Sequence, residues 1–338
     1  MCHFIRLFKE VKIMVQKIIL DTDPGIDDAM AILFAEAHPD ISLEAITCVY
    51  GNATIENATA NALFLKKKYS LKADVVKGAD KPLERPPVGA TTIVHGETGF
   101  GDFHAPKIED LKTDPRPAYQ YIIDSVRSQP GEITLVAVGP LTNLALALKA
   151  APDIVDLVKE VVVMGGAFGV NGHRGNVTPY AEANIHDDPH AADLVFTARW
   201  PTTIIGLDVT QQSFFTRQYL DELRGAAGEP GEFIWKISRF YLKFYSQKLG
   251  LEGCHVHDPS AIAYVIDKSL FTLREGPVRV VTDGPAEGHT IQKFDGRPYP
   301  HDEWQDKPSQ RIGVAVEDKR LLALYWDTLV DYGKRVSV

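Results

Sequence analysis

The stretch "KIILDTDPGIDDAMAIL", residues 17–33, joins a short β-rich apolar run to a segment with helical apolar spacing. Four aspartates lie within eight positions where the two parts meet, namely Asp21, Asp23, Asp27 and Asp28. In an open α/β sheet, the residues that follow each strand border the crevice in which ligands bind. The stretch therefore predicts a β-α unit whose strand end carries an unusual density of acidic groups.

The alternation of short apolar runs and helical segments continues along the chain, as is typical of β-α units in a mainly parallel sheet. Strands are expected near residues 17–22, 43–49, 73–77, 133–138, 160–164, 202–207 and 277–282. Helices are expected over residues 28–37, 54–69, 117–128, 141–150, 189–198 and 260–267. We therefore predict an α/β fold with a single Rossmann-like domain, in which helices flank a mainly parallel central sheet.

Two stretches do not follow this alternation of strands and helices. Residues 211–249 have a largely helical pattern, and we interpret them as a mostly helical lid region, with packing against the sheet as the alternative role of their aromatic side chains. Residues 283–310 are rich in Gly, Pro and Asp, which predicts turns and a small antiparallel excursion. The aromatic series in the helical stretch comprises Phe233, Trp235, Phe240, Tyr241, Phe244 and Tyr245.

Residues 1–13 mix charged side chains into every short apolar group, so they lack the uninterrupted apolar core of a secretory signal. We interpret them as an N-terminal extension, with a true start at Met14 as the alternative. No repeat and no low-complexity linker divides the remaining chain, so residues 14–338 are expected to form one domain.

The composition excludes several classes of function. The chain has 338 residues, 45% of them hydrophobic, which is enough for a large core. Its net charge is −9 and its main basic run is residues 66–68, so neither nucleic acid nor an anionic membrane is an expected partner. Uncharged stretches such as 133–148 are interrupted by Gly, Pro, Thr and Asn, so no membrane-spanning helix is expected. Three widely spaced cysteines, Cys2, Cys48 and Cys254, suit a reducing compartment and predict a cytoplasmic location.

The crowded aspartates need a physical explanation, because neighbouring carboxylates raise one another's pKa or require a cation between them. Helix capping is the alternative, since a carboxylate in the first turn accepts free amide protons and favours the helix dipole. Capping explains one aspartate but not three or four. Oxygen ligands without Cys or His at zinc spacing select a hard ion, Ca²⁺ or Mg²⁺. Ca²⁺ accepts six to eight mixed oxygen ligands, including backbone carbonyls and substrate hydroxyls, so we expect calcium in a pocket.

Other polar residues also follow predicted strands. Glu182 and Asn184 would share one face of an extended segment and grip neighbouring hydroxyls of a polyol, whereas an exposed loop pair is the alternative. The run His257-Asp258-Pro259 begins a predicted helix, and His257 is either structural there or a candidate acid.

Seven motifs carry a family resemblance. They are, in order, "DTDPGIDDAMAIL", "VYGN", "HGETGFGD", "VGPLTNLALAL", "VVMGG", "GNVTPYAEAN" and "VHDPSAIAYVID". In this order and spacing the sequence resembles the inosine-uridine-preferring nucleoside N-ribohydrolases over about residues 17–330. The resemblance implies that residues 14–338 form a catalytic domain that hydrolyses the N-glycosidic bond of ribonucleosides to ribose and free base.

The resemblance also implies a calcium site and a ribose site. Ca²⁺ would be held by the side chains of Asp23, Asp28 and Asp258 and by the backbone carbonyl of Val138. The 2′- and 3′-hydroxyls of the nucleoside would complete the coordination, with Asp27 and Asn184 as their hydrogen-bond partners. Asn176 and Glu182 would bind the 5′-hydroxyl, Asn52 would lie against the ribose, and Met164 would also contact the substrate.

Hydrolysis of an N-ribosidic bond passes through an oxocarbenium-like cation, so the site must stabilise positive charge and supply a nucleophile. Asp23 is the candidate base for the attacking water, and His257 is the candidate acid for the leaving base. His95 resembles a second histidine of the base pocket, and Tyr241 and Tyr245 could close over the base or pack in the core. Tryptophans stand in these regions in the purine-specific branch, so the histidines favour a broad or pyrimidine-leaning preference for uridine, cytidine and inosine.

Two other functions share parts of this sequence pattern. An Mg²⁺-dependent aspartate-nucleophile phosphotransferase also begins with Asp-x-Asp after its first strand, but the sequence after Asp23 does not continue that family's pattern and no P-loop is present. A non-catalytic calcium-dependent ribose or nucleoside sensor would need neither the base Asp23 nor the acid His257. The resemblance further implies a homo-oligomer, either a dimer or a homotetramer, that serves nucleoside salvage.

Overall fold

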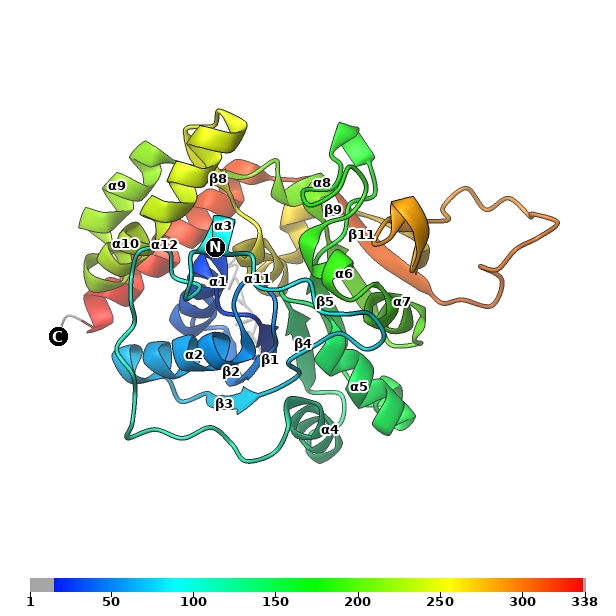
Figure 1. The fold of residues 1–338 in the computed structure, drawn as a ribbon, viewed down its shortest axis with the longest axis horizontal. Coiled ribbons are helices and arrows are strands. Elements are labelled where there is room, and N and C mark those ends of the chain that lie inside the picture. Colours follow the sequence, from blue (N-terminus) through cyan, green and yellow to red (C-terminus); the bar gives the residue numbers. More distant parts are fainter. Residues whose placement is uncertain (1–14, 337–338) are drawn as a thin grey trace, which may run out of the picture.

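A nine-stranded sheet lies at the centre of the computed structural model, which describes residues 15–336 (Figure 1). Its strands are β1 (Gln16–Thr22), β2 (Ile41–Cys48), β3 (Asp74–Lys77), β4 (Ile133–Ala137), β5 (Glu160–Met164), β6 (Thr202–Ile205), β9 (Phe271–Val280), β10 (Thr290–Gln292) and β11 (Ser309–Val316). The spatial order is β10-β9-β11-β6-β5-β4-β1-β2-β3. Pairing is parallel from β11 to β3, whereas β9 pairs antiparallel with both β11 and β10.

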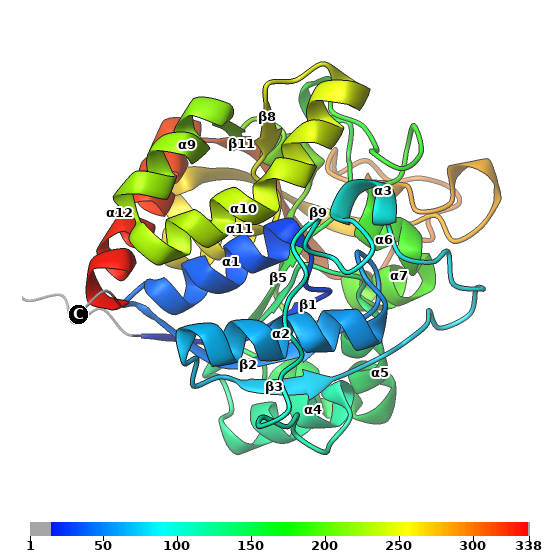
Figure 2. The same ribbon diagram turned by 60° about the vertical axis from the view of Figure 1, so that its left-hand side comes forward.

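Helices cover both faces of this sheet (Figures 1 and 2). One face packs against α1 (Ile26–Ala37), α2 (Ile55–Tyr69), α9 (Arg217–Ala226), α10 (Gly228–Phe244), α11 (Asp258–Ile266) and α12 (Asp318–Val336). The other face packs against α4 (Ala118–Ser128), α5 (Thr142–Ala150) and α7 (Pro189–Thr197). The short elements near the strand ends are α3 (Thr92–His95), α6 (Ala183–Asp187), α8 (Leu207–Thr210), the π-helical turn η3 (Tyr245–Leu249) and the pair β7 (Phe214–Thr216) and β8 (Gly253–His255).

Strand β1 shows why the apolar runs of the sequence are continuous. Ile18 and Leu20 face the core on the side of α1, while Ile19 faces the core on the side of α5. All three side chains are at most 1% exposed. A parallel strand that is covered on both faces needs apolar residues at every position, and alternation with polar residues is lost.

The topology places a crevice beside β1. The chain runs from β1 through β2 to β3 toward one edge, and β4 then returns to the opposite side of β1. Ligands in open α/β sheets bind at such a reversal of strand order. The ends of the two strands are joined by a hydrogen bond of 2.8 Å from the Val138 N–H to the Asp21 carbonyl. The acidic residues after β1 therefore border this crevice.

The expected α/β fold and the small antiparallel excursion at residues 283–310 are confirmed, the latter by β10. The strand expected at 277–282 is instead β9, which begins at Phe271. Strand β11 and helix α12 were not predicted. The aromatic residues of α10 pack against neighbouring helices and loops, since the Phe233 ring contacts Phe64 and Tyr69 of α2 and the Tyr241 ring contacts His95 of α3. The proposed extension, residues 1–13, lies outside the described residues.

Within residues 15–336, no helix is both long and apolar enough to cross a membrane.

A prediction about stability concerns Gln310, which lies at the start of β11 and outside the crevice. Its buried carboxamide accepts the Thr202 N–H at 3.0 Å and donates to the carbonyls of Phe196 and Ala198, both at 3.0 Å. Replacing Gln310 with Leu keeps the volume but leaves these backbone groups unsatisfied. We expect the free energy of unfolding to fall by about 2–4 kcal/mol.

Urea denaturation followed by circular dichroism measures this loss. The matched control is Gln218→Leu, because Gln218 is exposed on α9 and its amide contacts only the side chain of Glu222 in the described chain. This control should change the stability by less than about 0.5 kcal/mol. Equal effects of the two substitutions would contradict the assigned role of Gln310.

Candidate functional site

A cavity of about 300 Å³ opens at the carboxyl ends of the central strands. Among the predicted site residues, only Asp23 and Asp28 are not part of its lining, and both lie fully buried beside it at 1% and 0% exposure. A second cavity, of about 390 Å³, lies on the excursion between Ile291 and Trp304 and contains none of the predicted site residues. The predicted residues that line the first cavity are Asp27, Asn52, His95, Val138, Met164, Asn176, Glu182, Asn184, Tyr241, Tyr245, His257 and Asp258.

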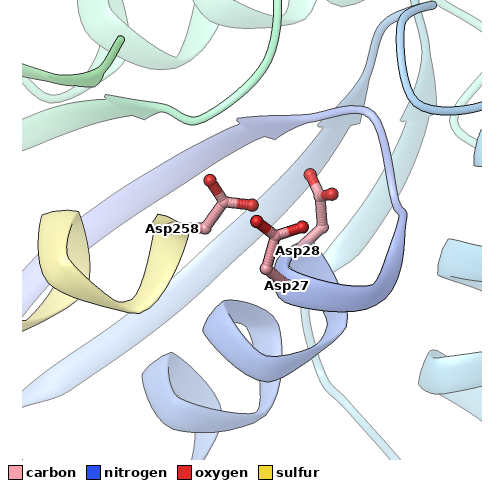
Figure 3. Close-up of side chains that lie close together, drawn as sticks. All are labelled: Asp27, Asp28 and Asp258. Carbon is pink, nitrogen blue, oxygen red and sulfur yellow. The ribbon is translucent and has the colours of Figure 1, made fainter. Parts of the chain in front are cut away.

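Three carboxylates converge at the floor of this cavity. Asp27 and Asp28 come from the first turn of α1, and Asp258 comes from the first turn of α11 (Figure 3). One oxygen from each lies within 4.8 Å of the others. Two helix N-termini thus direct acidic side chains to one point.

Helix capping accounts for Asp28. Its carboxylate accepts hydrogen bonds from the N–H groups of Gly25 at 2.9 Å and Asp23 at 3.2 Å, and from the Asn52 side-chain amide at 2.8 Å. The Thr22 hydroxyl also donates to it. The capping interpretation is therefore correct for this one aspartate, and the other acidic residues need a different explanation.

The other three aspartates each bury a carboxylate oxygen for which the described residues provide no hydrogen-bond partner. These atoms are Oδ1 of Asp23, Oδ1 of Asp27 and Oδ2 of Asp258. Burial, reinforced by the charge of Asp28, raises the pKa of Asp27 to about 7 and raises that of Asp23 well above its usual value. Burial and the nearby carboxylates likewise raise the pKa of Asp258. Buried unpaired oxygens of this kind fit a divalent cation, which would satisfy them and neutralise their charge.

Two glycines allow the backbone to approach Asp23 closely. A Cβ at Gly139 would lie 2.7 Å from Oδ1 of Asp23, and a Cβ at Gly51 would overlap Oδ2. Gly51 also has a φ of +152°, which side-chain-bearing residues rarely adopt. The Asn52 N–H donates to Oδ2 of Asp23 at 2.6 Å. The loops after β2 and β4 therefore enclose this carboxylate.

On the side expected to bind ribose, the local structure differs from the prediction. Glu182 and Asn184 do not lie in an extended segment, because Glu182 caps α6 by accepting the N–H groups of Asn184 and Ile185 at 3.0 and 3.2 Å. Asn184 instead donates its side-chain amide to the carbonyls of Val138 at 2.9 Å and Met164 at 3.1 Å. The cap still directs both polar side chains to the cavity.

Asn176 lies on the preceding loop. Its side-chain oxygen accepts the Ala183 N–H at 3.0 Å, which ties the loop to the first turn of α6. Its exposed position at the cavity mouth leaves its amide group open to a ligand.

On the opposite side, His257 is held at both ring nitrogens. Nδ1 lies 2.8 Å from the Thr210 hydroxyl, and Nε2 lies 3.0 Å from the Tyr245 hydroxyl. Burial lowers the pKa of His257 to about 3, so the ring is neutral at physiological pH. Tyr241 donates to Oδ2 of Asp27 at 3.2 Å and packs edge-on against Tyr245. Both tyrosines therefore belong to the cavity wall, and each also has extensive core contacts.

His95 forms the third part of this wall. Its Nδ1 accepts the Ile26 N–H at 3.2 Å, and its ring lies 5.5 Å from that of Tyr241. Burial lowers its pKa to about 4. The cavity thus combines an acidic floor with a wall of neutral histidines and tyrosines.

Some contributors were not found from the sequence. Thr210 was missed, because only the folded chain brings it to His257, 47 positions away. Asp208 follows strand β6, and its carboxylate accepts the N–H groups of Phe168 and Val170 at 2.9 and 2.6 Å. It therefore anchors the loop that leads to Asn176. Cavity-lining residues that were also missed include Thr91, Val94, Gln211, Phe244, Leu249 and His255.

Comparison with known proteins identifies the family of the chain. The sequence matches the family described as inosine-uridine preferring nucleoside hydrolase over residues 18–323. It is 43% identical over 284 residues to the inosine-uridine preferring nucleoside hydrolase of Leishmania major, a match that covers 83% of this chain and 88% of the relative. It is 41% identical over 279 residues to the pyrimidine-specific ribonucleoside hydrolase RihB of Escherichia coli, covering 82% and 87% of the two chains.

A solved plant nucleoside hydrolase superposes with a TM-score of 0.90 at 35% sequence identity, over 94% of this chain and 99% of that one. Sequence and fold both match over most of the described chain. The chain therefore belongs to the inosine-uridine preferring nucleoside hydrolase family and is a nucleoside hydrolase.

Proposed function

We propose that this hydrolase cleaves ribonucleosides to ribose and free base in a calcium-dependent reaction, with a broad or pyrimidine-leaning base preference. The observation that carries the proposal is the set of buried, unpaired carboxylate oxygens of Asp23, Asp27 and Asp258 at the cavity floor. A donor set made only of oxygens suits Ca²⁺, which accepts carboxylates, backbone carbonyls and hydroxyls together.

In this proposal, Asp23, Asp28 and Asp258 hold the ion together with the Val138 carbonyl. The three carboxylates whose oxygens converge in the structure are those of Asp27, Asp28 and Asp258, so Asp27 faces the same point. The bound ion would neutralise the carboxylates, orient a water and the ribose diol, and make that water somewhat more acidic. Its coordination would compete with the hydrogen bond that Asn184 donates to the Val138 carbonyl. Asn184 would then be free to turn its amide toward a ribose hydroxyl.

Residues of the chain carry out the remaining steps, each in a separate role. Asp23 takes the proton of the attacking water, since its Oδ1 has no other hydrogen-bond partner among the described residues. Asp27 and Asn184 bind the 2′- and 3′-hydroxyls, and Asn176 and Glu182 bind the 5′-hydroxyl. Positioned acid and base groups of this kind typically contribute about 10²- to 10⁴-fold each to the rate.

The leaving base needs a proton, because it otherwise departs as an anion. His257 is neutral and its Nε2 contacts the Tyr245 hydroxyl, which lines the cavity. In the proposed step, the Tyr245 O–H bond breaks and its proton bonds to the leaving base. The phenolic oxygen keeps the electron pair, and an Nε2–H donated by His257 would offset the burial that raises the pKa of Tyr245. The acid role predicted for His257 thus passes to Tyr245, and His257 assists it without carrying a positive charge.

The base preference rests on the cavity wall. His95 and His257 stand where the purine-specific branch of the family carries tryptophans, and none of the four tryptophans of this chain lines the cavity. Imidazole and phenol groups offer hydrogen bonds to the carbonyls of a small base, whereas indoles mainly offer stacking area. Uridine and cytidine are therefore expected to be cleaved at least as efficiently as inosine.

Two properties complete the proposal. The buried free thiols of Cys48 and Cys254 support a reducing, cytoplasmic location. The family resemblance supports a homodimer or homotetramer, which light scattering would measure.

Purified protein incubated with uridine, cytidine, inosine and adenosine tests the proposed activity through the release of free ribose. We expect turnover of the first three that a calcium chelator abolishes and added Ca²⁺ restores. Asp23→Ala should lose turnover by at least about 10²-fold, because the proposed base is removed. Asp331→Ala is the matched control, since Asp331 is an exposed carboxylate on α12. Chelator-resistant turnover, or a strong preference for adenosine, would contradict the proposal.

Thermal unfolding tests the ion without reference to activity. Saturating Ca²⁺ should raise the melting temperature by about 3 °C or more, because binding at 100 times Kd adds about 2.7 kcal/mol. Asp258→Asn should remove this rise, whereas Asp331→Asn should keep it.

In the presence of a calcium chelator, the melting temperatures of the wild type and Asp258→Asn should compare differently. The pKa of Asp258 is raised in the folded protein, so its ionised form destabilises the fold at neutral pH, and Asn at this position should melt at the same temperature as the wild type or higher. A calcium-induced shift that persists in Asp258→Asn would place the ion elsewhere.

A further inference from the structure

Thr210 lies behind the cavity wall at the end of the short helix α8. Its side chain is fully buried and does not line the cavity. Its hydroxyl lies 2.8 Å from Nδ1 of His257, on the side of the ring that faces away from Tyr245. Thr210 can therefore act on the site only through His257.

The hydrogen-bond pattern assigns a direction to this contact. Within residues 15–336, the Thr210 hydroxyl has Nδ1 of His257 as its hydrogen-bond partner, and its buried proton would lack an acceptor unless it is donated to Nδ1. A ring nitrogen that accepts a proton in this way carries none itself, and the ring proton then lies on Nε2. In that tautomer, Nε2–H donates to the Tyr245 oxygen, which lies 3.0 Å away.

This direction decides where the Tyr245 proton can go. When Nε2 donates, the Tyr245 oxygen accepts from His257, and its own O–H can be donated to the neighbouring Tyr241 hydroxyl or to a base in the cavity. In the other tautomer, Nε2 would accept the Tyr245 proton and draw it away from the cavity. The contact between Thr210 and His257, which lies outside the substrate cavity, thus controls the direction in which Tyr245 donates its proton.

We propose that Thr210 is a positioning residue that fixes the Nε2-protonated tautomer of His257 and so directs the Tyr245 hydroxyl proton toward the leaving base. The inference rests on the proposed hydrolysis of nucleosides and extends it by one residue that does not contact substrate. In the step concerned, the Tyr245 O–H bond breaks and a bond from that proton to the base forms. The N-glycosidic bond breaks and its electron pair takes up this proton, while the O–H pair stays on the phenolic oxygen. The proton that Asp23 took from the attacking water restores Tyr245 through solvent after the products leave.

The backbone at Thr210 is held independently of its hydroxyl. The Thr210 N–H donates to the Gly206 carbonyl at 3.1 Å, and the neighbouring Asp208 side chain ties α8 to the loop at Phe168. Thr210→Val keeps the branched shape and removes only the hydroxyl. The matched control is Thr203→Val on the adjacent strand β6, because the buried Thr203 hydroxyl also bonds one side chain, the Tyr264 hydroxyl at 3.2 Å.

Kinetics on two kinds of leaving group test the role. With uridine and inosine, Thr210→Val should lower kcat by about 10- to 100-fold with KM changed less than threefold. With p-nitrophenyl riboside, whose leaving group needs no proton, kcat should change less than threefold. Thr210→Ser should restore most of the lost rate, and Thr203→Val should match the wild type on both substrates. His257→Ala should show the same split between substrates as Thr210→Val.

Three outcomes would overturn the inference. They are an equal loss on both kinds of substrate, no loss on nucleosides, and a failure of Thr210→Ser to recover activity. If the wild type cleaves p-nitrophenyl riboside but no nucleoside, or neither, the proposed function itself has failed.

A second measurement needs no turnover. In protein labelled with ¹⁵N-histidine, the ring shifts of His257, identified by their loss in His257→Gln, should show a proton on Nε2 alone. Thr210→Val should shift these signals toward a mixture of tautomers, while Thr203→Val leaves them unchanged. A wild-type ring protonated on Nδ1 would refute the inference even in a fully active enzyme.

Discussion

The burial of several carboxylates at one point is the constraint on which the rest of this structure depends. Asp23, Asp27, Asp28 and Asp258 are each at most 6% exposed, and only Asp28 has both oxygens supplied with donors. Uncompensated burial of charge is among the most costly features a fold can contain. In our proposal, a divalent cation at this point offsets the cost and also organises the substrate.

The fold supplies the acidic point from separate parts of the chain. The reversal of strand order beside β1 opens the crevice, and the N-termini of α1 and α11 deliver aspartates into it. Gly51 and Gly139 let two loops approach Asp23 more closely than any other residue would permit. The neutral wall of His95, His257 and the tyrosines adjoins this floor, since Tyr241 donates to Asp27, and in our proposal it is where the leaving base is protonated.

Much of the site could be predicted from the sequence, because the acidic motif follows a strongly apolar strand and its helix has clear apolar spacing. The local structure at Glu182 could not, since α6 has only five residues and is too short to show a helical period. Strand β11 was missed because Gln310 and Arg311 interrupt its apolar pattern, although Gln310 is buried by three backbone partners from neighbouring elements. The contact between Thr210 and His257 depends on the tertiary fold, and no local sequence pattern predicts it.

The central claim is that one divalent cation makes the acidic point tolerable and binds there. Its most direct measurement is anomalous diffraction from crystals grown in millimolar calcium. The account predicts a single strong peak among the carboxylates of Asp23, Asp28 and Asp258, within bonding distance of the Val138 carbonyl. Featureless density at that point, with the four aspartates still buried, would contradict it.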